Sequence, residues 1–293
     1  MNRRSSLAGA GNRLVAEFFK TLGPRVFRQT DLSLILGEHR QAWGLPASLT
    51  VSRFISALVD DELVKRVSLR SEKYRDFVRY AVREPSPYLL GASLGQHAYL
   101  SHGTAMFLNG LTDQLAKTIY VNDEQRPKLF PPGVLTQQGI DAAFSRQQRV
   151  SSNVYVDGTT RYLVVSGKNT GRLEVTEIRT PDGGSVDTTK LERTLIDIAV
   201  RPDYAGGPHV VRDAYAAARD RVSVSVLVAT LKALDYAYPY HQMIGFYMAR
   251  AGYEAKRLEA LKKIGLRFNF YLSYGLREPD YDQSWHLFVP KGF

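Results

Sequence analysis

Apolar residues in the first third of the chain recur first at helical and then at strand spacing. Repeats of three and four positions predict three short helices, over residues 14–22, 32–43 and 51–58. Gly23 and Gly44 are stop signals after the first two helices, and Gly44 opens a tight turn. Thr50 or Ser48 can cap the third. The N-terminus therefore predicts a small helical unit.

A basic hairpin is predicted directly after these helices. Residues 63–70 and 77–82 alternate apolar and polar positions around a polar turn at 71–75, which is the pattern of two antiparallel strands. Three short helices followed by a basic hairpin are the element order of a winged helix-turn-helix. We therefore expect a winged-helix domain over residues 1–84.

Two prolines mark the end of this unit. Pro85 and Pro87 oppose the continuation of helix and sheet, so the predicted second domain spans residues 88–293. Its pattern is mixed, with helices expected at 97–111, 136–148, 189–200, 210–219, 224–234, 239–251 and from 254, and strands at 117–121, 161–166, 173–180, 267–272 and 285–289. Residues 167–171 are interpreted as a hairpin turn. The expected fold class is α+β, with a winged helix followed by a larger mixed α/β domain.

The positive charge of the chain is concentrated in its first third. The whole chain carries a net charge of +10, and residues 1–83 hold 15 lysines and arginines against 8 acidic residues, a net charge of +7. A basic region of this kind favours an anionic partner, and nucleic acid is the partner that also fits the predicted winged helix.

The predicted DNA-binding residues lie on the third helix and around it. The second helix of a helix-turn-helix pair enters the major groove, where hydroxyls approach base edges and an arginine can hold guanine. The outward residues of that helix are Thr50, Ser52, Arg53 and Ser56. Cations for phosphates are Arg25, Arg28, Lys65, Arg66, Arg70, Lys73 and Arg75. The acids at 60–62 are expected away from DNA. Two alternatives stay open, an ordinary solvated face and a winged helix that binds protein.

The composition excludes several classes of site. The chain has no cysteine, so disulfides, thiolate zinc sites and a cysteine nucleophile are excluded, and a cytoplasmic location is favoured. No apolar run approaches the roughly 18–20 residues of a membrane span, so no membrane partner is expected. The histidines lack metal-ligand spacing.

Catalytic patterns are incomplete. Gly167-Lys168 lacks the remaining residues of a phosphate loop, and Ala199 stands where a nucleotidyltransferase-like pattern needs a second metal carboxylate. Asp157, Glu174 and Glu177, with Arg179 in the place of a lysine, leave a magnesium-dependent nuclease as an alternative. We expect no catalytic residue, no metal and no cofactor.

The C-terminal half contains a tyrosine-rich stretch. Tyr236, Tyr238 and Tyr240 are interpreted as core aromatics or as a partner-binding patch. His241 beside them is expected to be a buried, hydrogen-bonded histidine.

Three segments of the second domain resemble one protein family. They are AYLSHGTAMFLNGLTD at 98–113, LERTLIDIAVRPDYAGG at 191–207 and DYAYPYHQMIGFY at 235–247. Together they resemble the AbiEi antitoxins of AbiE-type abortive-infection systems, the type IV toxin–antitoxin systems of phage defence, over roughly residues 95–273.

The resemblance implies an antitoxin that is also a transcriptional autorepressor. It implies a winged helix that binds inverted repeats of operator DNA, and a C-terminal domain that neutralises a nucleotidyltransferase toxin encoded nearby. The DNA contacts named above come from the helix pattern and the charge, and not from the family. A transcription factor with a ligand-sensing second domain and no toxin partner is the other open interpretation.

Overall fold

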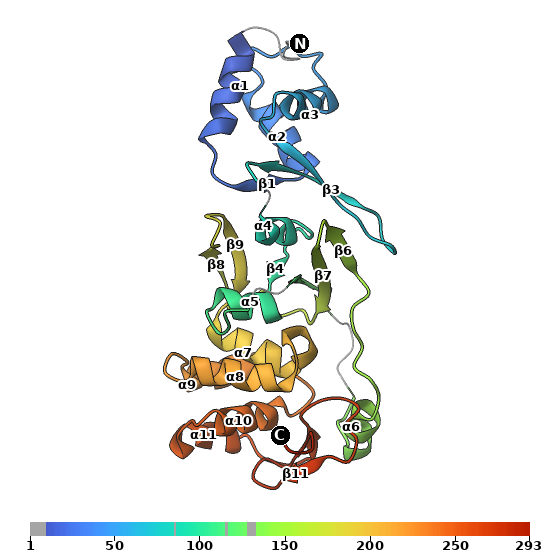
Figure 1. Ribbon diagram of the computed structural model, residues 1–293, viewed down its shortest axis with the longest axis vertical. Helices are drawn as coiled ribbons and strands as arrows, with labels where there is room; N and C mark the ends of the chain where they lie inside the picture. The colour runs from blue at the N-terminus through green and yellow to red at the C-terminus, as the bar shows by residue number, and fades with distance from the viewer. Residues whose placement is uncertain (1–9, 85, 115–116, 128–132) are drawn as a thin grey trace.

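The computed structural model describes residues 10–84, 86–114, 117–127 and 133–293. Pro85, one of the two prolines predicted to separate the domains, lies outside the described residues. The chain is arranged along one long axis, with the N-terminal helices at one end, a sheet in the middle and C-terminal helices at the other end (Figure 1). Helices and strands are mixed throughout, so the predicted α+β fold class is confirmed.

The N-terminal unit contains the three predicted helices and the predicted hairpin. Its elements are α1 (Ala10–Thr21), β1 (Arg25–Phe27), α2 (Gln29–His39), α3 (Val51–Asp60), β2 (Lys65–Leu69) and β3 (Phe77–Val82). The strands form an antiparallel sheet in the order β1-β3-β2. With three residues, β1 is too short for its alternation to be recognised in the sequence.

The turn between α2 and α3 is fixed by local contacts. The Arg40 guanidinium donates hydrogen bonds to the carbonyls of Pro46 (2.6 Å) and Leu49 (2.9 Å). Gly44 has a φ of +63°, a conformation that glycine adopts without strain. The helix predicted to reach Trp43 ends at His39, yet Trp43 stays buried because its ring stacks on those of His39 and Phe54.

A six-stranded mixed sheet forms the centre of the molecule. This part comprises α4 (Pro87–Ala92), β4 (Tyr99–Leu100), α5 (His102–Leu108), β5 (Thr118–Glu124), α6 (Gln137–Phe144), β6 (Val154–Asp157), β7 (Thr160–Gly167), β8 (Val175–Arg179) and β9 (Ser185–Thr189). The strand order is β6-β7-β5-β4-β9-β8, in which β5 is parallel to β7 and β4 is parallel to β9.

Two predictions for this sheet are wrong. The helix expected at 97–111 is a short strand, β4, followed by α5, because Ser101 interrupts the helix with an extended backbone. The expected hairpin around residues 167–171 does not form, since β7 pairs with β5 and β6 while β8 pairs with β9. The segment after β7 therefore crosses the sheet, and alternation alone could not identify the strand partners.

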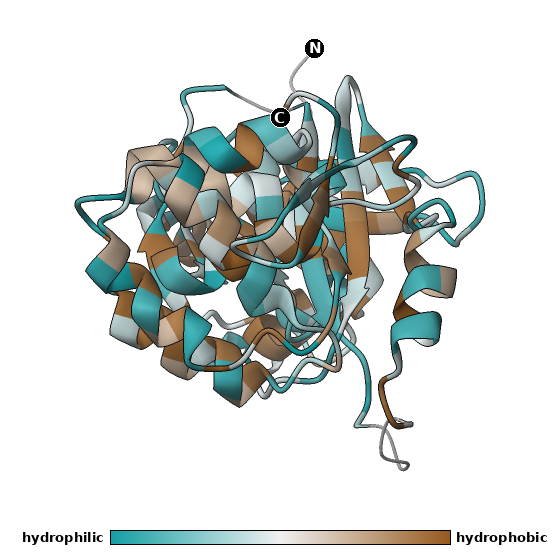
Figure 2. Cartoon of the chain, turned by 90° about the horizontal axis from the view of Figure 1, so that it is seen from below, coloured by the Kyte–Doolittle hydropathy of each residue, from teal (hydrophilic) through white to brown (hydrophobic). Residues whose placement is uncertain are grey.

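The C-terminal part packs helices around a large apolar core. It consists of α7 (Leu191–Val200), a short 3-10 helix (Pro202–Ala205), α8 (Pro208–Ala218), α9 (Val224–Leu234), α10 (Tyr240–Arg250), α11 (Ala255–Lys262), β10 (Phe270–Tyr271), β11 (Asp280–Asp282) and β12 (Leu287–Val289). Apolar residues of these helices and strands form one buried cluster. Figure 2 shows apolar and polar residues alternating along the helices.

A shared apolar cluster joins the hairpin to the central sheet. Val67, Leu69 and Ala81 of the hairpin pack with residues of the second domain such as Tyr155 and Tyr162. Arg70 and Val156 exchange backbone hydrogen bonds of 3.0 and 2.8 Å. The end of the hairpin next to its loop is thus held against the second domain, and the loop of residues 70–76 continues from it (Figure 1). Within the described residues, no helix has the length and apolar character needed to cross a membrane.

Candidate functional site

The outer face of α3 is exposed, as the helical periodicity predicts. Phe54, Ile55 and Leu58 are buried in the N-terminal core, and Ser52, Arg53 and Ser56 on the other side are exposed. The Thr50 hydroxyl accepts a hydrogen bond from the Arg53 backbone N–H (3.3 Å) and caps the helix. The side chains expected to contact bases therefore lie together on the first turns of α3.

A shallow hollow of about 230 Å³ brings part of this face next to the hairpin. Ser52 and Ser56 of α3 line it together with Arg66 of β2 and with Gln29 at the start of α2. Asp60 lines the same hollow, which corrects the expectation that this acid lies away from the face. A carboxylate at this position opposes phosphate and favours a group that donates hydrogen bonds.

The cations of the hairpin lie in two different environments. Lys65 is paired with Glu84, with 3.2 Å between Nζ and Oε2, and the backbone of Arg70 is bound to the second domain. Lys73 and Arg75 are exposed in the hairpin loop, which the Ser71 and Asp76 side chains hold by accepting backbone hydrogen bonds. The loop begins directly after Leu69 and ends directly before Phe77, which both pack in the shared apolar cluster.

Arg25 and Arg28 differ in their availability. Arg25 is exposed on β1, whereas the Arg28 guanidinium is bound to the Asp31 carboxylate at 2.9 Å. Burial opposes the charge of Asp31, but hydrogen bonds from Arg28 outweigh it and lower the pKa of Asp31. The Arg28 side chain thus has a structural role at the start of α2.

A second site, which the sequence interpretation did not predict, is a cavity of about 840 Å³ in the second domain. It lies beyond the carboxyl ends of the parallel strands β5 and β7 and is also lined by α5, α7 and the loop between α9 and α10. Ligands of open α/β sheets bind at this kind of strand end. The residues come from five segments far apart in sequence, so no local motif marks the cavity.

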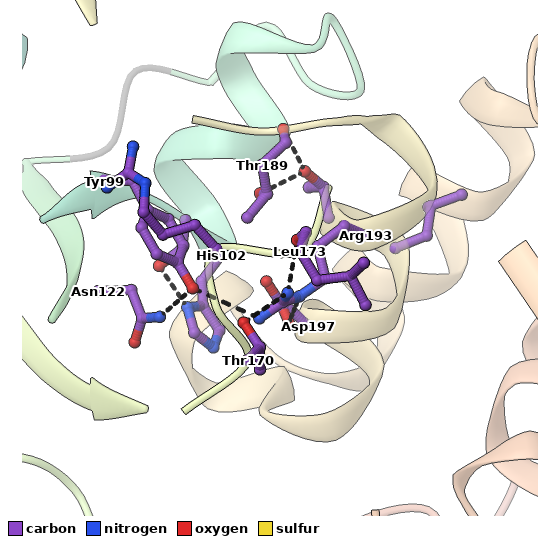
Figure 3. A network of polar contacts seen from close by, with 12 residues as sticks. Tyr99, His102, Asn122, Thr170, Leu173, Thr189, Arg193 and Asp197 are labelled. Carbon is purple, nitrogen blue, oxygen red and sulfur yellow. Dashed lines mark hydrogen bonds and ion pairs between the residues drawn. The ribbon is translucent and has the colours of Figure 1, made fainter. Parts of the chain in front are cut away.

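A buried ion pair forms one wall of this cavity (Figure 3). Arg193 and Asp197, four residues apart on α7, are 2.8 Å apart and almost fully buried. Burial opposes the charge of Arg193, but the neighbouring Asp197 carboxylate raises the pKa of Arg193 above its usual value. Arg193 also donates to the Leu173 carbonyl (2.8 Å), which holds the segment that crosses from β7 to β8.

Tyr99 links the ion pair to Asn122 and Glu124. The Tyr99 hydroxyl donates to Glu124 (2.9 Å) and accepts from the Asn122 amide (2.5 Å). Asn122 is 3% exposed, and among the described residues its Oδ1 atom has no hydrogen-bond partner. Burial raises the pKa of the Tyr99 hydroxyl, so this hydroxyl stays protonated in the network.

His102 is a neutral group in the cavity wall. Burial lowers its pKa to about 4, and its Nδ1 atom lies 2.8 Å from the Ser101 hydroxyl. Its φ of +48° is uncommon for a residue with a side chain, and Asp235, across the cavity, has a φ of +44°. Backbone strain of this kind is found where the surrounding structure holds a functional group in place.

The acids of the nuclease alternative do not come together. Asp157 lies on β6 and Glu177 on β8, which are the two opposite edges of the six-stranded sheet. Glu174 is paired with Lys190 at 3.0 Å, and Glu177 accepts a hydrogen bond from Ser185. Nowhere in the described part of the chain do three acidic or histidine side chains gather as metal ligands do.

The tyrosine-rich segment serves both the core and the cavity. Tyr240 is buried, while Tyr236 and Tyr238 are half-buried and pack against the core, and all three line the cavity. His241 is buried, with Nε2 2.6 Å from the Gly265 carbonyl, so its prediction as a hydrogen-bonded core histidine is confirmed.

Comparisons with known proteins show the fold alone. The chain is similar in structure to the RV2827C protein from Mycobacterium tuberculosis, with a TM-score of 0.56 and 15% sequence identity over 98% of this chain and 93% of that chain. No protein-family model matches the chain, and no curated protein matches it.

Proposed function

We propose that this protein is an antitoxin and transcriptional autorepressor whose N-terminal unit is a winged helix that binds operator DNA. The observation that carries the proposal is the exposed outer face of α3, which presents Ser52, Arg53 and Ser56. Ser52 and Ser56 line one hollow with Arg66 of the hairpin. An exposed helix of this length fits a major groove, and a guanidinium near its N-terminal end can hold guanine O6 and N7.

Exposed cations elsewhere in the N-terminal unit support phosphate contacts. Arg25 lies on one strand of the small sheet, and Lys73 and Arg75 are in the exposed hairpin loop. Phosphate contacts of this kind set orientation and affinity, while α3 supplies sequence preference. A purely protein-binding winged helix has no need for this concentration of positive charge.

The antitoxin activity is proposed for the second domain. It rests on the resemblance of residues 98–113, 191–207 and 235–247 to AbiEi antitoxins. Residues of all three segments line the cavity, for example His102, Arg193 and Tyr236, although they lie far apart in sequence. The proposed partner is a nucleotidyltransferase toxin encoded next to this chain.

Binding to upstream DNA tests the repressor function. The wild-type protein should retard a duplex from upstream of its own gene, and the affinity should fall steeply as salt rises, because each phosphate contact releases counterions. A scrambled duplex of the same length and composition is the control. Failure to retard the upstream duplex at low salt, or equal affinity for both duplexes, would contradict the proposal.

Co-expression with the neighbouring reading frame tests the antitoxin function separately. Expression of that frame alone should arrest growth, and expression of the full-length chain should restore it. An Arg53→Ala variant should restore growth as well, because that residue lies outside the second domain. A harmless neighbouring frame would instead favour a transcription factor without a toxin partner.

A further inference from the structure

We propose that the cavity of the second domain binds a nucleoside monophosphate, a small molecule that joins one phosphate group to a planar base. This inference does not depend on DNA binding or on a toxin partner. It rests on the charge of the cavity, on an unpartnered buried acceptor, and on the aromatic side chains beside it.

The cavity has an excess of positive charge. Among the described residues, its lining includes Arg126, Lys168, Arg193 and Arg201, against the two acids Asp197 and Asp235. Asp197 is neutralised by Arg193 at 2.8 Å, and Asp235 is exposed to solvent, with its carboxylate 3.8 Å from Lys168. The Arg201 guanidinium donates to the Arg149 carbonyl through Nη1 (3.2 Å), which leaves its other N–H groups. These groups and Arg126 can bind an anion, and arginine is the side chain that best matches the oxygens of a phosphate.

The ammonium group of Lys168 is held in place by backbone carbonyls. Its Nζ atom donates to the Leu234 carbonyl (2.7 Å) and to the Asp235 carbonyl at the end of α9. An ammonium has three donors, and the third faces no acceptor closer than the Asp235 carboxylate at 3.8 Å among the described residues, so it can donate to a ligand oxygen. The contact also ties the segment after β7 to the loop before α10, which keeps two walls of the cavity in place before a ligand arrives.

An unpartnered hydrogen-bond acceptor in the cavity wall indicates that the ligand also carries a planar base. Asn122 is 3% exposed, and its amide N–H₂ donates to the Tyr99 hydroxyl. Its Oδ1 atom has no hydrogen-bond partner in the part of the chain that the structure describes. A buried acceptor without a donor is uncommon in folded proteins, and ligand sites are one place where it occurs. Gly167 allows this arrangement, because a Cβ atom there would lie 2.3 Å from Asn122 Oδ1. The exocyclic amine or ring N–H of a base would supply the missing donor.

Aromatic side chains complete the match to a base. Tyr236 and Tyr238 are half-buried in the cavity wall, and the neutral ring of His102 lies in the same lining. Such rings stack on any base and add little preference among bases. The volume of about 840 Å³ lies within the range of roughly 300–1,000 Å³ for small-molecule sites.

Titration calorimetry on the full-length protein tests the proposal directly. The probes are adenosine, guanosine, cytidine and uridine 5′-monophosphates, the four nucleosides, and orthophosphate. We expect at least one monophosphate to bind at least tenfold more tightly than its nucleoside and than orthophosphate. No binding of any monophosphate at millimolar concentration would overturn the proposal, as would orthophosphate binding as tightly as the best monophosphate.

Variants then locate the site. Arg126→Ala and Arg201→Gln should each weaken monophosphate binding about tenfold, which corresponds to about 1.4 kcal/mol, and should leave nucleoside binding unchanged. Tyr236→Leu should weaken both monophosphate and nucleoside. The matched control is Lys256→Ala, an exposed cation on α11 outside the cavity.

Arg126 is exposed, so its variant should fold, and its melting temperature without ligand verifies this. If Lys256→Ala weakens monophosphate binding as much as Arg126→Ala does, the ligand is attracted by the positive charge of the whole surface. That result would refute the cavity as the binding site.

Discussion

The outer face of α3 and the cavity of the second domain use arginines in opposite ways. Arg53 is exposed on a regular helix, whereas Arg193 is almost fully buried and paired with Asp197. An exposed arginine contributes little to stability and is available to a large anion such as DNA. A buried arginine is costly unless its partners are fixed, so it belongs to a preorganised small site.

The largest contrast between these regions should appear in stability. Arg193→Ala should cost about 3–5 kcal/mol of unfolding free energy, because it leaves the Asp197 charge buried without a partner. Arg53→Ala should change the same quantity by less than about 0.5 kcal/mol. Urea denaturation followed by circular dichroism measures both. The Arg193→Met/Asp197→Leu double variant should recover the lost unfolding free energy. Equal stability of Arg193→Ala and Arg53→Ala would contradict the difference between the two regions.

Gly167→Ala tests the close packing of the cavity wall. The added Cβ atom would lie 2.3 Å from Asn122 Oδ1, so the asparagine must move, at a cost of up to about 3 kcal/mol of unfolding free energy. Gly23→Ala is the matched control, because no atom of the described residues lies within 4 Å of its Cβ position. A Gly167→Ala variant as stable as Gly23→Ala would show that Asn122 is not held as described.

The pH dependence of stability reports on buried His102. Burial lowers its folded pKa to about 4 from an unfolded value of 6.5, so the unfolded state takes up the proton first as pH falls. The unfolding free energy that neutral His102 contributes is fully present above pH 6.5 and is lost between pH 6.5 and about 4. Between pH 7 and pH 5 the loss should be about 2 kcal/mol. Burial also lowers the pKa of His241, so His241 destabilises the folded state in the same direction as the pH falls.

His102→Asn should reduce this pH dependence while tolerating the positive φ, since asparagine adopts that conformation more readily than most residues. The control is His97→Asn, at an exposed position. Denaturation curves at pH 7 and pH 5 compare the three proteins. An unchanged pH dependence in His102→Asn would contradict the assignment of His102 as a neutral buried group.

The sequence predicted the outer face far better than the cavity, for physical reasons. Helical and strand periodicity reports local environment, so the buried side of α3 and the hairpin of β2 and β3 followed from the order of apolar residues. The cavity depends on strand order, which periodicity does not encode. The segment at Gly167-Lys168 was interpreted as a hairpin turn, although it lines the cavity and contacts the end of α9.

The sequence also did not predict how the hairpin packs against the second domain, because that packing depends on long-range contacts. Apolar residues of β2 identified a strand but not the surface against which that strand packs. Likewise, Asp60 is the last residue of α3, and the positions of Arg66 and Tyr80 in the tertiary structure place it in the same hollow as Ser52 and Ser56. Side chains brought together from separate elements need the tertiary structure.

The central claim is that α3 reads base sequence, and Arg53→Ala tests it most directly. Fluorescence anisotropy would compare wild type, Arg53→Ala and the control Arg13→Ala, an exposed arginine on α1, on the upstream duplex and on random DNA at one salt concentration. We predict that Arg53→Ala loses about 1–3 kcal/mol of binding free energy on the upstream duplex and little on random DNA. Equal losses on both duplexes, or no loss on either, would contradict the account.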